Sequence, residues 1–256
     1  MTRTILSAMA VVLAAAGAAR GVAVIDVNYN GLGPFEPVKG RVFNWNDSSP
    51  TSLLFSFTSG QGIAAGYYTF NGAPGNPSDY RGALWGYCLE PQQDTPPPNQ
   101  LQPFGVANVA DSPLPGSPIP GAGGMGSDKA AAVARAIYAA YAPYGGATNW
   151  MALDSFHAAA LNATLWEIVY EKPGQSLNPD TGYARVFVGV QTALTDTLRS
   201  YAAGYLAAAN DPQAPQAGGL FVLTNSQYQD IIVPEPATLA LIGAGLAAIA
   251  RRRRRA

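Results

Sequence analysis

The chain has few of the residues that most metal and redox sites require. Its 256 residues include one cysteine, Cys88, and one histidine, His157. A single cysteine excludes an internal disulfide, and a single histidine excludes the multi-histidine sets that bind zinc. We therefore expect neither a metal nor a cofactor.

Charge is also scarce. Only 12% of the residues are charged, against about 25% in an average soluble domain. Five of the basic residues stand together at the C-terminus: Arg251, Arg252, Arg253, Arg254 and Arg255. The remainder is acidic and offers no basic face to replace phosphate counterions, so no nucleic-acid partner is expected.

The two ends of the chain predict targeting segments. Residues 1–19 combine a basic start at Arg3, an apolar core and small residues near the end, which is typical of a secretory signal peptide. At the other end an apolar run over 237–250 leads into the arginines. A short motif precedes that run: Val233, Pro234, Glu235 and Pro236.

The apolar run predicts a single membrane helix of marginal length. Its 14 residues span about 21 Å, less than the roughly 30 Å of a hydrocarbon core. Flanking arginines stay on the cytoplasmic side, which places the rest of the chain across the membrane. Pro236 suits the first helical position, and Pro234 favours an extended stretch that is open to a processing enzyme.

This tail resembles the PEP-CTERM sorting signal of exopolysaccharide-producing Gram-negative bacteria. The resemblance implies that exosortase, a membrane-embedded cysteine protease, reads the tail and removes it. The protein would be anchored transiently in the inner membrane and then reach the cell surface or the extracellular matrix. We divide the chain into a signal peptide (1–19), one domain (20–232) and the sorting tail (233–256).

The sequence of the domain predicts strands in its first part and helices in its second part. β-branched and aromatic residues indicate strands over 22–27, 38–45, 53–57, 64–70 and 83–89. Prolines and glycines over 91–126 argue against any regular element there. Helices are expected over 128–141, capped by Ser127, over 154–171, and along the apolar stripe from Phe187 to Tyr205. Strand character returns over 220–223 and 228–233.

This order predicts an α+β fold, a β-sandwich or barrel with a helical layer inserted over about 127–209. Cys88 ends a strand, in the segment Tyr87-Cys88-Leu89-Glu90. Asn162 lies one helical turn from Ala158 and from Trp166, on an apolar helix face. A buried amide needs a hydrogen-bond partner, and a nearby strand backbone is the ordinary one.

The strand end at Cys88 and the Leu-Trp-Glu-Ile helix that follows Asn162 resemble the thioester domains of bacterial surface adhesins. In that family the cysteine sulfur condenses with a glutamine side chain, releases ammonia and stores an electrophile for a target surface. Here the matching residue is Asn162, whose side chain is one methylene shorter. We therefore expect the fold without the Cys88–Asn162 bond.

Other residues are weaker candidates. His157 is expected on the surface or half-buried, too isolated for a triad. Glu167 and Glu171 share one helix edge and are expected on a solvated face. Four tryptophans could form a sugar-stacking platform but are more often core residues: Trp45, Trp85, Trp150 and Trp166.

The sequence thus predicts a non-enzymatic, adhesive or structural protein with an unknown surface target. Two alternatives remain: a secreted enzyme acting on extracellular polysaccharide, and a non-covalent binding module for the same polymer.

Overall fold

The computed structural model describes residues 24–56, 63–77, 80–112, 124–146, 151–188 and 192–234. The expected signal peptide and the tail beyond Pro234 lie outside these residues, and so does Trp150. Within the described ranges, no helix is both long enough and apolar enough to cross a membrane.

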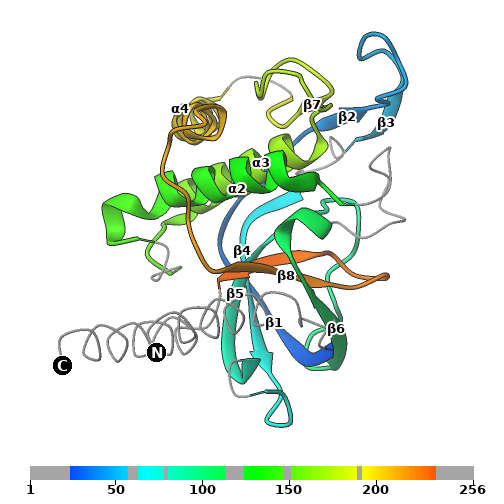
Figure 1. Cartoon of the computed structure of the whole chain (residues 1–256), viewed down its shortest axis with the longest axis vertical. Coiled ribbons are helices and arrows are strands. Elements are labelled where there is room, and N and C mark those ends of the chain that lie inside the picture. Colours follow the sequence, from blue (N-terminus) through cyan, green and yellow to red (C-terminus); the bar gives the residue numbers. More distant parts are fainter. Residues whose placement is uncertain are drawn as a thin grey trace, which may run out of the picture.

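Six strands close into an antiparallel barrel with the order β1-β4-β5-β9-β8-β6 (Figure 1). Alternate residues of β1 point inward, and their apolar side chains fill the barrel with aromatic residues from β4 and β6. The strands are β1 (Val24–Val38), β4 (Ile63–Gly72), β5 (Gly82–Cys88), β6 (Leu101–Ala107), β8 (Leu220–Thr224) and β9 (Ile231–Pro234). The expected mixture of helices and strands is confirmed, and the structure shows that the large sheet is antiparallel.

Strand β6 corrects the sequence analysis, because it lies inside the segment for which no regular element was expected. Pro103 stands opposite Asp26 of β1, ahead of the residues of β6 that pair with β8. At that point β6 has a partner on one side only, so a missing N–H costs no bond toward β8. Val109–Asp111 then form the short 3-10 helix η2.

Three helices are inserted between β6 and β8: α2 (Gly126–Tyr141), α3 (Ser155–Tyr170) and α4 (Ala193–Asn210). Asp154 caps α3 by accepting the backbone N–H of His157, and Thr192 caps α4 in the same way through Thr195. Ser127 does not cap α2, because that helix already begins at Gly126. Phe187 precedes α4 instead of belonging to it.

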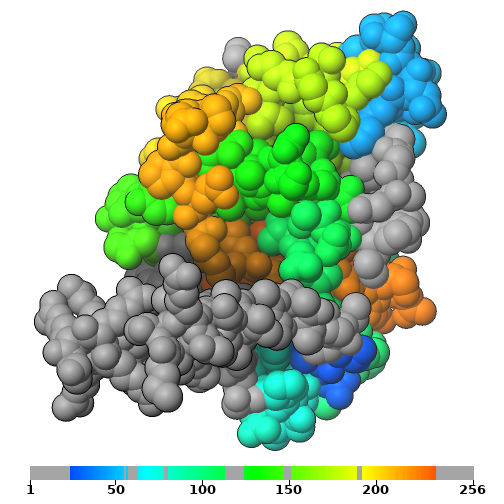
Figure 2. Space-filling view, in the orientation of Figure 1, coloured from blue at the N-terminus to red at the C-terminus, as the bar shows by residue number. Residues whose placement is uncertain are grey.

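Helix α3 is the centre of the molecule. It contacts β1 and β4 on one side and α2 and α4 on the other, and every residue from Ala158 to Tyr170 is buried. A helix that is apolar all round is expected in such a position. Figure 2 shows the helical segments as one continuous layer above the barrel.

A small second sheet lies near the C-terminal end of α3. It has the order β3-β2-β7, with β2 (Arg41–Phe43), β3 (Leu53–Ser56) and β7 (Ala184–Arg185). In Figure 2 the hairpin of β2 and β3 lies beside the segment that contains β7. A further 3-10 helix, η3 (Ala142–Tyr144), follows α2.

Candidate functional site

The side chain of Asn162 joins two barrel strands at the point where they separate. Its oxygen accepts the N–H of Gly66 at 3.1 Å, and its NH₂ group donates to the carbonyl oxygen of Cys88 at 2.8 Å. Strands β4 and β5 pair as far as Tyr67 and Tyr87, so Gly66 and Cys88 would be the next pair of the ladder. The carboxamide therefore replaces a peptide group and continues the ladder through a side chain of α3.

Trp166 binds the same carbonyl. Its indole Nε1–H donates to the carbonyl oxygen of Cys88 at 2.9 Å, one helical turn after Asn162. Both side chains are buried, and the Cys88 side chain is fully enclosed. Two donors on one buried acceptor fix the end of β5 against α3.

The environment of Cys88 disfavours its thiolate. Burial raises the pKa of the thiol, and the nearby carboxylates of Glu90 and Asp230 raise it further. The thiolate is the nucleophilic form of cysteine. The structure thus brings Cys88 and Asn162 together, but it holds the amide by both polar ends and keeps the sulfur in its unreactive form.

Glu167 and Glu171 contradict the expectation of a solvated helix face, since both are buried. The Glu171 carboxylate accepts the backbone N–H groups of Lys172, Tyr183 and Ala184. It thereby ties the C-terminal end of α3 to the segment that enters β7. The close approach requires glycine at 182, because a Cβ there would meet a Glu171 carboxylate oxygen at 2.2 Å.

The carboxyl group of Glu167 accepts fewer hydrogen bonds than that of Glu171. One carboxyl oxygen accepts the N–H of Asn178 at 2.9 Å, while the other has no hydrogen-bond partner among the described residues. Burial raises the pKa of Glu167 well above its usual value, and the neighbouring Glu171 raises it further. A protonated carboxyl group suits this position, because burying an unpaired charge is costly.

Half-buried Lys129 completes this polar cluster, and sequence reasoning missed it. Its Nζ donates to the carbonyl oxygens of Val169 and Glu171 and lies 4.5 Å from the centre of the Trp45 ring. Burial lowers the pKa of Lys129 to about 7, although Glu171 and Glu167 oppose the shift. A cation at the last carbonyls of a helix stabilises the helix dipole. The only sequence signal was a lysine in the first turn of α2.

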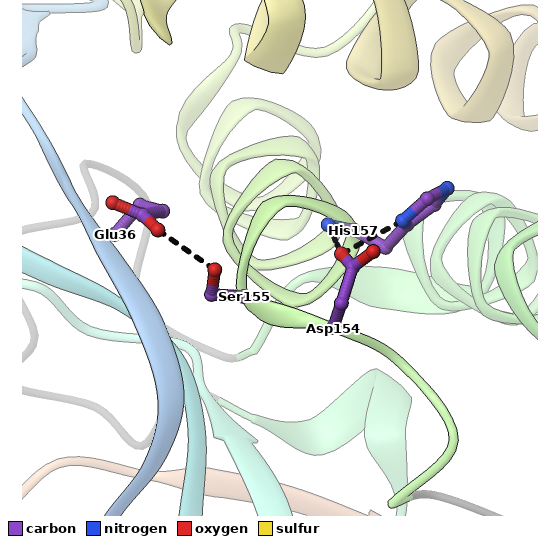
Figure 3. Close-up of polar contacts among 4 residues, drawn as sticks. All are labelled: Glu36, Asp154, Ser155 and His157. Carbon is purple, nitrogen blue, oxygen red and sulfur yellow. Dashed lines mark hydrogen bonds and ion pairs between the residues drawn. The ribbon is translucent and has the colours of Figure 1, made fainter.

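His157 is half-buried, as expected, and does not form a catalytic triad. Its Nδ1 lies 2.8 Å from an Asp154 carboxylate oxygen, while the Ser155 hydroxyl donates to Glu36 at 2.7 Å. Figure 3 shows that the two pairs point to opposite sides of the first turn of α3. The imidazole stacks on Tyr201, with ring centres 3.9 Å apart. These are two separate pairs, and no proton relay connects Ser155 with His157.

The three tryptophans that the structure describes do not form one exposed platform. Trp166 is buried, and Trp45 packs under Lys129 while its Nε1–H donates to the carbonyl oxygen of Tyr170 at 2.9 Å. Trp85 is partly buried in β5. A sugar-stacking platform built from these three residues is therefore excluded.

The beginning of the C-terminal motif belongs to the barrel. Val233 is fully buried and stands opposite Phe221 of β8, and Pro234 ends β9 opposite Leu220. This corrects the expectation that the motif is open throughout. Residues 233–255 match the PEP-CTERM protein-sorting motif.

The chain carries a PEP-CTERM sorting signal.

The PEP-CTERM motif implies an exported protein that is anchored transiently in the membrane and processed by exosortase, a membrane protein. Its tail beyond Pro234, including Arg251 to Arg255, lies outside the described residues. The match to the PEP-CTERM motif covers residues 233–255 only, so it identifies the tail and not the rest of the domain.

Two further comparisons concern the body of the PEP-CTERM protein. Its structure is similar to the N-terminal thioester domain of fibronectin-binding protein SfbI from Streptococcus pyogenes, with a TM-score of 0.41 and 11% identity. The match covers 81% of this chain and 97% of that one, and it is too weak to support an argument about chemistry. No curated protein matches the sequence.

Proposed function

We propose that this exported protein has an adhesive or structural role at the cell surface or in the extracellular matrix, with a thioester-like domain that has lost its chemistry. The PEP-CTERM motif over 233–255 supports delivery to that place. The observation that carries the rest is the position of Asn162, whose amide takes the place of a peptide group between β4 and β5.

This position favours a structural amide over a reactive one. Condensation with Cys88 would convert the NH₂ group of Asn162 into free ammonia and remove the donor to the Cys88 carbonyl oxygen. The raised pKa of Cys88 further disfavours attack by the sulfur. The domain would therefore act through its surface, without covalent capture of a target and without turnover.

Delivery is tested by replacing Arg251 to Arg255 with glutamine in the native host. A cationic block resists translocation, so this variant is expected to lose retention and sorting. Replacing the same number of lysines or arginines within the domain is a poor control because several of them donate to backbone carbonyl oxygens, so the matched control is lysine at all five tail positions. Normal surface display of the glutamine variant contradicts the interpretation of the tail.

A second candidate is non-covalent binding of extracellular polysaccharide near the beginning of α3. Tyr144 packs edge-on to His157 with ring centres 6.2 Å apart, and half-exposed Phe156 and exposed Met151 belong to the same part of the chain. Aromatic rings with a polar neighbour suit the faces and hydroxyls of sugars.

This candidate predicts that Tyr144→Ala weakens binding to extracted exopolysaccharide. Leu101→Ala is the matched control, because Leu101 is an exposed apolar residue of β6 outside this cluster. If both variants bind the exopolysaccharide with equal affinity, the polysaccharide does not bind at Tyr144 and this hypothesis is refuted. A turnover assay on the same polymer tests the enzyme alternative, and release of shorter chains would support it.

A further inference from the structure

Three elements bring aromatic and acidic side chains together at the beginning of α3. The cluster consists of one residue from η3, two from the cap and first turn of α3, and two from α4: Tyr144, Asp154, His157, Tyr201 and Tyr205. His157 lies between the rings of Tyr201, at 3.9 Å, and Tyr144, at 6.2 Å. Burial raises the pKa of the Tyr205 hydroxyl, and the nearby acidic groups of Tyr144 and Asp154 raise it further. The cluster thus joins a buried phenol to partly exposed aromatic and acidic groups.

The Asp154 carboxylate is charged and accessible. Burial opposes its ionisation, but hydrogen bonds from the backbone N–H and the ring of His157 lower its pKa overall. Both of those bonds go to Oδ1, at 2.9 and 2.8 Å. The side chain is 60% exposed, so Oδ2 can meet a ligand from solvent. Because a carboxylate only accepts hydrogen bonds, Nδ1 of His157 is the donor, and Nε2 of a neutral ring is an acceptor.

The charge around this turn is negative. On the other side of the first turn of α3, the Ser155 hydroxyl donates to the Glu36 carboxylate, so two carboxylates flank the turn (Figure 3). Together they outweigh the roughly half positive charge of a helix N-terminus. The whole chain has 16 acidic and 15 basic residues, and five of the basic ones are the arginines of the tail. A cationic ligand therefore suits this site, and a polymer of uronic acids does not.

The tyrosine rings strengthen this preference, because the face of an aromatic ring attracts cations and also packs against sugar rings. We propose that the cluster binds a polysaccharide with free amino groups: a sugar ring stacks on Tyr144, and a protonated amino group pairs with Asp154. Nε2 of His157 accepts a hydrogen bond from a sugar hydroxyl. This inference rests on polysaccharide binding near the beginning of α3, the second candidate function, and names the class of polymer.

The first test compares short oligomers of glucosamine and of N-acetylglucosamine, equal in length, on the wild-type protein. Acetylation removes the positive charge of the amino group. The glucosamine oligomer is expected to bind about tenfold more tightly, which corresponds to one cation held by aromatic and carboxylate partners. Titration calorimetry measures both affinities. Equal affinities, or tighter binding of the acetylated oligomer, overturn the inference and leave sugar binding intact. Failure of both oligomers to bind contradicts the inference and the second candidate function together.

The second test removes the charge of Asp154 and keeps the helix cap. Asp154→Asn should bind both oligomers equally, because asparagine caps a helix as well as aspartate but carries no charge. Asp128→Asn is the matched control, an exposed carboxylate in the first turn of α2, and should keep the preference for glucosamine. A preference that survives in Asp154→Asn, or that Asp128→Asn also loses, overturns the inference. Tyr144→Ala should weaken binding of both oligomers, and unchanged binding of both contradicts the second candidate function itself.

Discussion

Asn162 and Cys88 are joined by a hydrogen bond of 2.8 Å from the side-chain amide to the backbone carbonyl oxygen, between the middle of α3 and the end of β5. The same amide accepts the N–H of Gly66, so the helix closes a gap between β4 and β5. By its resemblance to thioester domains, Asn162 would be the residue that reacts with Cys88. In this structure its side-chain amide instead makes the hydrogen bonds of a backbone peptide group. A thioester between Cys88 and Asn162 would lower the stability of the domain, because it would consume the NH₂ group of the amide that links β5 to α3.

Asn162→Leu is expected to lower the free energy of unfolding by about 1–3 kcal/mol, because it leaves the buried N–H of Gly66 without a partner. Thr164→Val is the matched control on the same buried helix. Its hydroxyl donates only to the carbonyl oxygen of Ala160 within α3, so its loss should cost less. Urea unfolding of both variants measures the difference, and an unchanged midpoint for Asn162→Leu refutes the structural role.

Asn162 and Trp166 should be coupled, since both donate to the carbonyl oxygen of Cys88. Each single substitution, Asn162→Leu or Trp166→Phe, leaves that oxygen one side-chain donor, and the double variant leaves it none. The double variant should therefore lose more stability than the sum of the two, by about 0.5–3 kcal/mol. Additive losses in a double-mutant cycle would show that the shared acceptor does not matter.

Glu171→Gln is expected to destabilise the domain by about 1–3 kcal/mol, because the carboxylate holds three backbone N–H groups and an amide offers only one acceptor oxygen. Glu167→Gln is the matched control, one turn earlier on α3. Its pKa is raised well above normal by burial, so a neutral amide imitates its protonated form. Equal losses from the two substitutions argue against this distinction.

Lys129 should make stability rise with pH on the alkaline side of neutrality. Its pKa is lowered to about 7 in the folded state from 10.5. Between these values the unfolded chain binds more protons than the folded one, so unfolding becomes less favourable as the pH rises. Lys129→Met should flatten the slope of the unfolding free energy in that window. If the unfolding free energy of Lys129→Met has the same pH dependence as that of the wild type, groups other than Lys129 cause the dependence.

The sequence predicted α3 well because its signals are local. Asp154 is a favourable N-cap, and the spacing of Ala158, Asn162 and Trp166 placed the amide on a buried face. The same reasoning failed for Glu167 and Glu171. Helix α3 is covered on all sides, by strands and by two other helices, and a periodic pattern cannot reveal a helix without a solvated face.

Long-range pairing limited the prediction elsewhere. β1 is one strand of 15 residues with two irregularities, and it continues through 28–37, where the sequence suggested a break between strands over 22–27 and 38–45. β6 forms around Pro103 because one side of the strand is free there. Lys129 gained its role only through the C-terminal end of α3, 40 residues later in the chain. No local pattern encodes that contact.

The intact mass of the mature protein from the native host tests the central claim most directly. The account predicts a mass that lacks both terminal segments and shows no further deficit, with Cys88 reacting as one free thiol after unfolding. A deficit of one ammonia that disappears in Cys88→Ala would contradict it, because Cys88 and Asn162 would then form a thioester and the protein would be a covalent adhesin.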